Sequence, residues 1–202
     1  MGKIASYYMG LYHSNIIWIK KILSWFGLSI GIGLLTFVFN PDFFQAIVTA
    51  FQDKFGTAPV ADIHLAVQIF IQNIIVSAVA IFGGILLGLG SILVVVVNGF
   101  LIGYVLMAIL YAGRDNFLQA IILIVGGLVP HGILEIPAFL LAATLGLRLG
   151  WEWMQKDATG NRGRTFASNF KQAIYQIPLI VLLLIFAALL EVFVSGKIVD
   201  KF

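Results

Sequence analysis

The sequence predicts an all-helical protein that crosses a lipid bilayer about five times and forms a single domain over residues 1–202. Of the 202 residues, 61% are hydrophobic and only 10% are charged, whereas about 25% of the residues in a soluble domain are charged. The apolar residues also cluster into stretches near the roughly 20 residues that a helix needs to cross the hydrocarbon core. We therefore expect a polytopic transmembrane helical bundle.

The first expected span covers residues 22–39 and follows Lys20 and Lys21. It is longer than the apolar core of a typical secretory signal, and no A-x-A-like cleavage site follows it, so we expect an uncleaved helix. Asn40 and Pro41 end the span, because proline cannot continue a helix.

The loop over residues 41–64 is expected to begin with a short helix at the membrane surface, over residues 41–51. Its apolar side chains recur near helical spacing, which is typical of a helix that lies flat on a bilayer with one face in the lipid. These side chains are Phe43, Phe44, Ile47 and Phe51.

Ordinary spans are expected at residues 65–87, 92–112 and 173–194, with a tight turn at residues 88–91 between the first two. The apolar segment 117–149 is different, because it is too long for one straight span and too short for two.

Two glycines and a proline interrupt this fourth segment, at Gly126, Gly127 and Pro130. We expect a half-helix over residues 117–125, followed by a longer helix from His131 onward. Broken helices occur at membrane depth where the irregular backbone is buried in protein or lines a cavity.

Charge predicts the orientation, because loops rich in Lys and Arg stay in the cytoplasm. The N-terminus and the loop 150–172 are basic, whereas the loop 41–64 is acidic. We therefore expect a multi-pass protein of the cell membrane with the N-terminus and the loop 150–172 in the cytoplasm. The fourth segment must then cross once, and the C-terminus must be external. The basic residues are Lys3, Lys20, Lys21, Lys156, Arg162, Arg164 and Lys171.

Glycines four residues apart recur along the spans and predict close helix packing, since small residues let helix backbones approach in lipid. The contacts are either within one chain or between two copies in a homodimer, and the sequence leaves both open. The pairs are Gly27–Gly31, Gly84–Gly88, Gly99–Gly103 and Gly146–Gly150.

Polar residues within the apolar segments mark the candidate site. His131 and Glu135 are four residues apart and share a helix face. An ionisable residue at the bilayer centre costs about 2.5–3.5 kcal/mol on insertion scales and usually marks a functional interior. Glu191 is a second acid that can face this interior, and Asn73 and Asn98 either bond neighbouring helices or line the site.

Three interpretations of Glu135 remain open from the residues alone. Its carboxyl group is held structurally by His131, Asn98 or the backbone, or it lines a conduction or proton pathway. In the third, His131, Glu135 and Glu191 bind a divalent metal, for which one histidine and two carboxylates are a reasonable ligand set. The sequence contains no nucleic-acid motif, phosphate loop or Ser/His/Asp enzyme signature.

Four stretches together resemble one protein family: VNGFLIG at 97–103, PHGILEIPA at 130–138, GLRLG at 146–150 and AALLEVFV at 187–194. They are similar to the stage II sporulation protein M family, and the resemblance runs over about residues 72–196. It implies a multi-span membrane protein without established catalytic residues.

In spore-formers the family's namesake acts in engulfment with partners that remodel septal peptidoglycan. The resemblance thus implies a membrane anchor or scaffold for membrane or cell-wall proteins. A channel or transporter that uses His131 and Glu135 is the first alternative, and a metal-dependent intramembrane enzyme is the second.

Reporter fusions test the orientation. A reporter that is active only in the cytoplasm should report from Arg162, and one that is active only outside should report from the C-terminus, because the basic loops stay inside. A fusion at Asp53 in the acidic loop is the external control. External activity at Arg162 would contradict this topology.

Overall fold

The computed structural model describes residues 3–55, 61–152, 154 and 161–195, and for residues 3–14, 51, 54, 55 and 131 it describes the backbone alone. All regular elements among these residues are helical, which confirms the predicted fold class. The elements are α1 (Lys3–Phe39), α2 (Phe43–Phe55), α3 (Ile63–Gly83), α4 (Leu89–Ala112), α5 (Phe117–Ile122), η1 (Leu123–Leu128), α6 (Val129–Glu152), α7 (Arg162–Leu190) and η2 (Glu191–Ser195).

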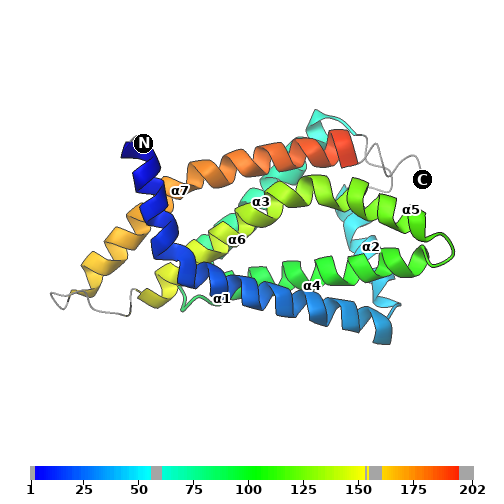
Figure 1. Ribbon diagram of the computed structural model, residues 1–202, viewed down its shortest axis with the longest axis horizontal. Helices are drawn as coiled ribbons and strands as arrows, with labels where there is room; N and C mark the ends of the chain where they lie inside the picture. Colours follow the sequence, from blue (N-terminus) through cyan, green and yellow to red (C-terminus); the bar gives the residue numbers. More distant parts are fainter. Residues whose placement is uncertain (1–2, 56–60, 153, 155–160, 196–202) are drawn as a thin grey trace.

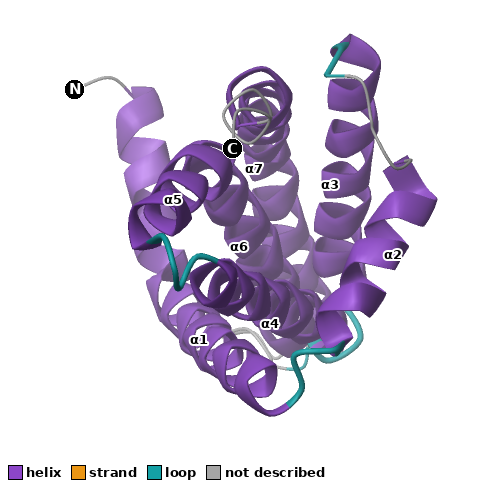
Figure 2. Ribbon diagram, turned by 90° about the vertical axis from the view of Figure 1, so that its right-hand side faces the viewer, coloured by secondary structure: helices purple, strands orange, loops and turns teal. Residues whose placement is uncertain are grey.

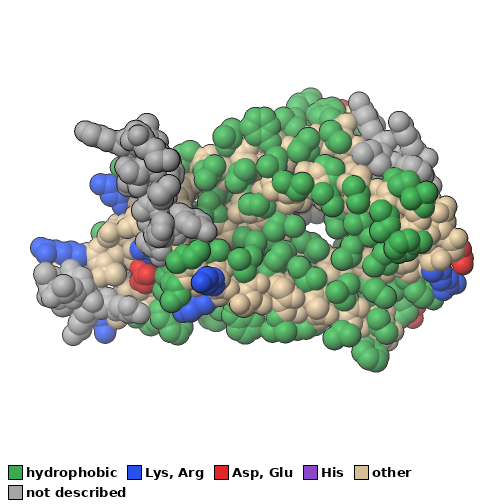
Figure 3. Space-filling view, viewed as in Figure 1, with side chains coloured by type: hydrophobic (Ala, Val, Ile, Leu, Met, Phe, Trp, Pro, Cys, Tyr) green, Lys and Arg blue, Asp and Glu red, His purple; other side chains and the backbone are tan. Residues whose placement is uncertain are grey.

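Five stretches of the described chain are long and apolar enough to cross a membrane, as the sequence predicts. Successive stretches run in opposite directions along the long axis of the bundle (Figure 1). Lys and Arg side chains gather at the end where α6 finishes and α7 begins (Figure 3). Which end faces the cytoplasm remains a prediction. The stretches are Asn15–Phe39, Ile63–Gly84, Leu89–Ala112, Gly132–Glu152 and Arg162–Ser195.

α6 is the central helix of the bundle. Figure 2, which looks along the bundle, shows it enclosed by α1, α3, α4 and α7, and it packs against each of them. Of the residues in its apolar window, 56% are buried, against at most 33% in the other spans. A lipid-facing helix needs only one buried stripe, so this fraction identifies α6 as the helix that the others pack around.

Glycines set the closest helix contacts. A Cβ atom added at Gly146 of α6 would collide with the carbonyl oxygen of Ala80 on α3, and one at Gly103 of α4 would collide with that of Ile30 on α1. The helix backbones therefore touch directly, as expected for small residues in a membrane bundle. The predicted pairs Gly84–Gly88, Gly99–Gly103 and Gly146–Gly150 all pack within the chain, against backbone or side-chain atoms of neighbouring helices.

The remaining pair, Gly27 and Gly31 on α1, faces open space. A Cβ added at either position would meet nothing within 4 Å. This pair is free to contact a second copy, so a homodimer through this face of α1 remains a prediction.

The turn between α3 and α4 lies earlier than expected. The predicted turn at residues 88–91 is wrong in its bounds, because α3 ends at Gly83 and α4 already begins at Leu89. Gly88 ends the turn with a φ of 80°, a left-handed conformation that glycine adopts without strain.

The fourth crossing bends but does not break in the predicted way, so the half-helix ending at Val125 is not confirmed. The π-helical segment η1 joins α5 directly to α6, and the N–H of Val129 bonds to the carbonyl of Ile124. In an α-helix the ring of Pro130 would clash with the carbonyl four residues back. The wider π turn removes this conflict and lets the helix continue with a bend.

α2 runs across the end of the bundle, consistent with the predicted surface helix (Figure 1). Its Phe44 and Ile47 pack against a cluster that includes Phe37 and Tyr104. The hydroxyl of Tyr104 donates to the carbonyl of Asn40 at 2.7 Å, which fixes the chain between α1 and α2.

Substitution of Gly146 tests the close packing of α6. We expect Gly146→Ala to lower the free energy of unfolding by about 1–3 kcal/mol, since the new Cβ overpacks the contact with Ala80. The melting temperature in detergent measures this loss. Gly27→Ala is the matched control and should not lower it, because its Cβ meets open space. Equal effects would contradict the packing.

Candidate functional site

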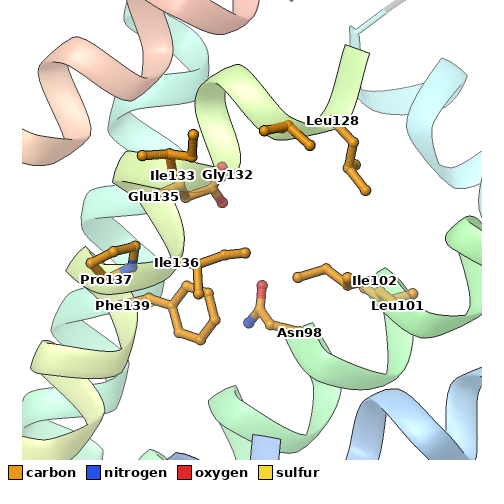
Figure 4. A pocket seen from close by; sticks show the side chains of 11 residues that line it. Asn98, Leu101, Ile102, Leu128, Gly132, Ile133, Glu135, Ile136, Pro137 and Phe139 are labelled. Carbon is orange, nitrogen blue, oxygen red and sulfur yellow. The ribbon is translucent and has the colours of Figure 1, made fainter. Parts of the chain in front are cut away.

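A cavity of about 520 Å³ lies between α4, η1 and the first half of α6 (Figure 4). Two polar side chains line it, Asn98 from α4 and Glu135 from α6. The other lining residues are apolar or glycine: Leu101, Ile102, Leu128, Val129, Gly132, Ile133, Ile136, Pro137 and Phe139.

The cavity exists because α6 is close to its neighbours at one end only. From Ala142 to Gly150 the helix is fully buried, whereas Ile133 and Pro137 in its first half are exposed. The bend at η1 carries the chain over the space between α4 and α6. In the space-filling view an opening is visible there (Figure 3). That view is from the side of the bundle, so the opening faces the flank that contacts lipid.

Glu135 reaches into the cavity from α6, on the side that faces Asn98 (Figure 4). Within the part of the chain that the structure describes, its carboxyl group has no hydrogen-bond or ion-pair partner. No described bond from Asn98 or the backbone therefore holds the carboxyl group, and the interpretation in which His131, Asn98 or the backbone holds it stays a prediction, because the side chain of His131 is outside the described residues.

Asn98 presents its oxygen to the same space. Its Nδ2 donates to the carbonyl of Val94 at 2.8 Å, one turn back on α4. Its Oδ1 points toward the side of the cavity where Glu135 lies (Figure 4). Asn98 thus offers the cavity a hydrogen-bond acceptor.

Glu191 lies in η2, which contacts both η1 and α6. It is outside the cavity lining. The structure therefore brings Glu135 and Asn98 together at the cavity and places Glu191 on a neighbouring segment. Asn73 is half-buried on α3 and is not part of this lining.

The predicted metal set stays a prediction. His131 lies in the first turn of α6, but its side chain is outside the described residues. Among the side chains that are described, no group of three or more His, Cys, Asp or Glu is placed to hold a metal ion.

A second polar cluster, which the sequence did not single out, is centred on Arg148 near the end of α6. Arg148 is only 8% exposed. Its Nε pairs with Glu152 at 2.9 Å, and its terminal nitrogen donates to Asn15 at 2.8 Å and to Gln172 at 3.0 Å. The i,i+4 spacing of Arg148 and Glu152 was the available signal for this pair.

Glu152 completes the connection between helices. It accepts hydrogen bonds from Trp18 on α1 at 2.9 Å and from Asn169 on α7 at 2.6 Å. The cluster thus joins α1, α6 and α7. Four of its members, Asn15, Trp18, Asn169 and Gln172, lie outside the predicted apolar bounds of α1 and α7 and are paired inside the protein.

A sequence model of the family described as Stage II sporulation protein M matches residues 22–196. This match covers most of the chain, which therefore belongs to that family of membrane proteins, as the sequence motifs predicted. Comparison with curated proteins and comparison with solved structures each gave no match.

A double-mutant cycle tests the buried ion pair. Removing one partner of such a pair costs about 3–5 kcal/mol, because the other charge is left buried. We expect Arg148→Met and Glu152→Leu each to lower the melting temperature strongly, and the double variant to lose less than their sum.

The exposed pair Arg114 and Asp115 is the control for this cycle. Its atoms are 3.9 Å apart and its side chains are 61% and 93% exposed, so its coupling should be close to zero. Additive losses at Arg148 and Glu152 would contradict the proposed role of the cluster.

Proposed function

We propose that this member of the Stage II sporulation protein M family is a membrane transporter that binds its ligand in the cavity at Glu135. One observation carries the proposal: an intramembrane carboxyl group faces a cavity without a partner among the described residues. Ionisable side chains at this depth are costly and mark substrate or ion pathways.

The size and position of the cavity support ligand binding. Its volume of about 520 Å³ lies within the range of roughly 300–1,000 Å³ that is usual for small-molecule sites. A few polar groups among many apolar ones fix the orientation of a ligand in such sites. Glu135 and Asn98 are suited to that role.

The lining favours a transporter over an aqueous channel. A channel for hydrated ions needs a polar path along the bundle, whereas most of these lining residues are apolar. The opening in the side of the bundle offers a route from the bilayer (Figure 3). The ligand therefore partitions into lipid before it reaches Glu135.

Anchoring or scaffolding of partner proteins, including those that remodel septal peptidoglycan in spore-formers, remains a prediction of family membership. The two roles differ in what they require of Glu135. A scaffold tolerates Glu135→Gln as long as the fold survives, because its partners bind elsewhere. A transporter does not.

Flux in proteoliposomes tests the proposal against a panel of ions, metabolites and lipid-soluble solutes. We expect at least one solute to cross with the native protein, and we expect its flux to fall at least about tenfold with Glu135→Gln. That factor corresponds to about 1.4 kcal/mol, the size of one hydrogen bond to a charged group.

The matched control is Asp115→Asn, which removes one negative charge from an exposed side chain outside the cavity. It should leave the flux unchanged. Absence of flux across the whole panel would contradict transport and favour the scaffold. Equal flux with Glu135→Gln would contradict ligand binding at Glu135.

A further inference from the structure

We infer that the cavity at Glu135 selects a lipophilic organic cation, a molecule with an apolar body and one positive charge. The inference rests on the proposed function and names the class of its ligand. Three features of the described residues carry it: the acidic side chain of Glu135, the absence of Lys and Arg from the described lining, and the apolar side chains of that lining.

An acidic side chain faces this cavity. Glu135 lines it, and Glu191 lies on the neighbouring segment η2, which contacts both η1 and α6. The carboxylate form of Glu135 attracts a cation placed beside it, whereas it repels an anion.

The described lining residues include no Lys or Arg that could neutralise these carboxyl groups. The next basic residue along α6, Arg148, is on the order of 20 Å away at 1.5 Å per residue. It is also engaged by Glu152, Asn15 and Gln172.

Asn98 offers the cavity an acceptor. One N–H of its amide donates to the carbonyl of Val94, and its oxygen points toward the side of the cavity where Glu135 lies (Figure 4). That oxygen and the carboxylate oxygens of Glu135 match an ammonium group or another cation.

An inorganic cation fits less well than an organic one. Calcium takes 6–8 oxygen ligands and magnesium demands octahedral geometry, whereas the described lining provides only the carboxyl group of Glu135 and the amide oxygen of Asn98. The apolar side chains instead match a hydrocarbon body. The ring of Phe139 adds an aromatic group, which attracts cations.

A pair of probes with equal size and opposite charge tests the inference. Tetraphenylphosphonium is the cation and tetraphenylborate is the anion, and both dissolve in lipid. Equilibrium binding to the purified full chain in nanodiscs is measured, and uptake by empty nanodiscs is subtracted. We expect saturable binding of the cation and none of the anion.

Two variants locate the binding. Glu135→Gln removes the charge at nearly constant shape and should weaken cation binding at least about tenfold. Gly132→Leu fills the cavity instead. A Cβ at Gly132 would meet only Ile136, at 3.6 Å, so the larger side chain extends into open space and should also abolish binding. Asp115→Asn is the charge control and should bind normally.

The outcomes separate this inference from the proposed function. Equal binding of both probes, stronger binding of the anion, or cation binding that survives in both cavity variants overturns the inference. The inference is also overturned if neither tetraphenylphosphonium nor the smaller tetrapropylammonium binds. If Glu135-dependent flux of a neutral or anionic solute is then found, transport stands and the ligand class is wrong. If no flux is found, both fail.

Discussion

Direct contact between helix backbones at glycine is the constraint on which the rest of the structure depends. At Gly146 and Gly150, α6 approaches the chain at Ala80 and Gly84 so closely that no Cβ fits. Hydrophobic attraction between helices is weak in lipid, so this close packing holds the second half of α6 in place. The first half of α6 is not held by this close packing. The cavity opens where the glycine contacts stop and η1 bends the chain.

The polar residues also differ between the two halves of α6. At the closed end, the buried Arg148 and the half-buried Glu152 are paired with partners on α1 and α7. Such a network fixes a single arrangement of helices, because each group that loses its partner is left desolvated. At the open end, Glu135 faces the cavity, and no described residue pairs with it. The first set of charges joins the helices, and the second is where we propose that a ligand binds.

Much of the fold follows from hydropathy, and less of the site does. The spans were predictable because lipid demands apolar stretches of fixed length. Glu135 and Asn98 stood out as polar residues within such stretches. Arg148 did not, because a basic residue near a span end usually marks topology, and only tertiary structure shows it buried. The π segment η1 also escaped prediction: Pro130 signals an interruption but not whether the helix breaks or widens.

The central claim is that the carboxyl group of Glu135 is reachable from the bilayer, and chemical modification measures this most directly. The chain contains no cysteine, so a lipid-soluble carbodiimide meets no competing thiol. After treatment in nanodiscs, peptide mass spectrometry reports which carboxyl groups carry the adduct. We expect modification of Glu135 and none of Glu152, whose oxygens are engaged by Arg148, Trp18 and Asn169. An unmodified Glu135, or equal modification of both residues, would contradict it.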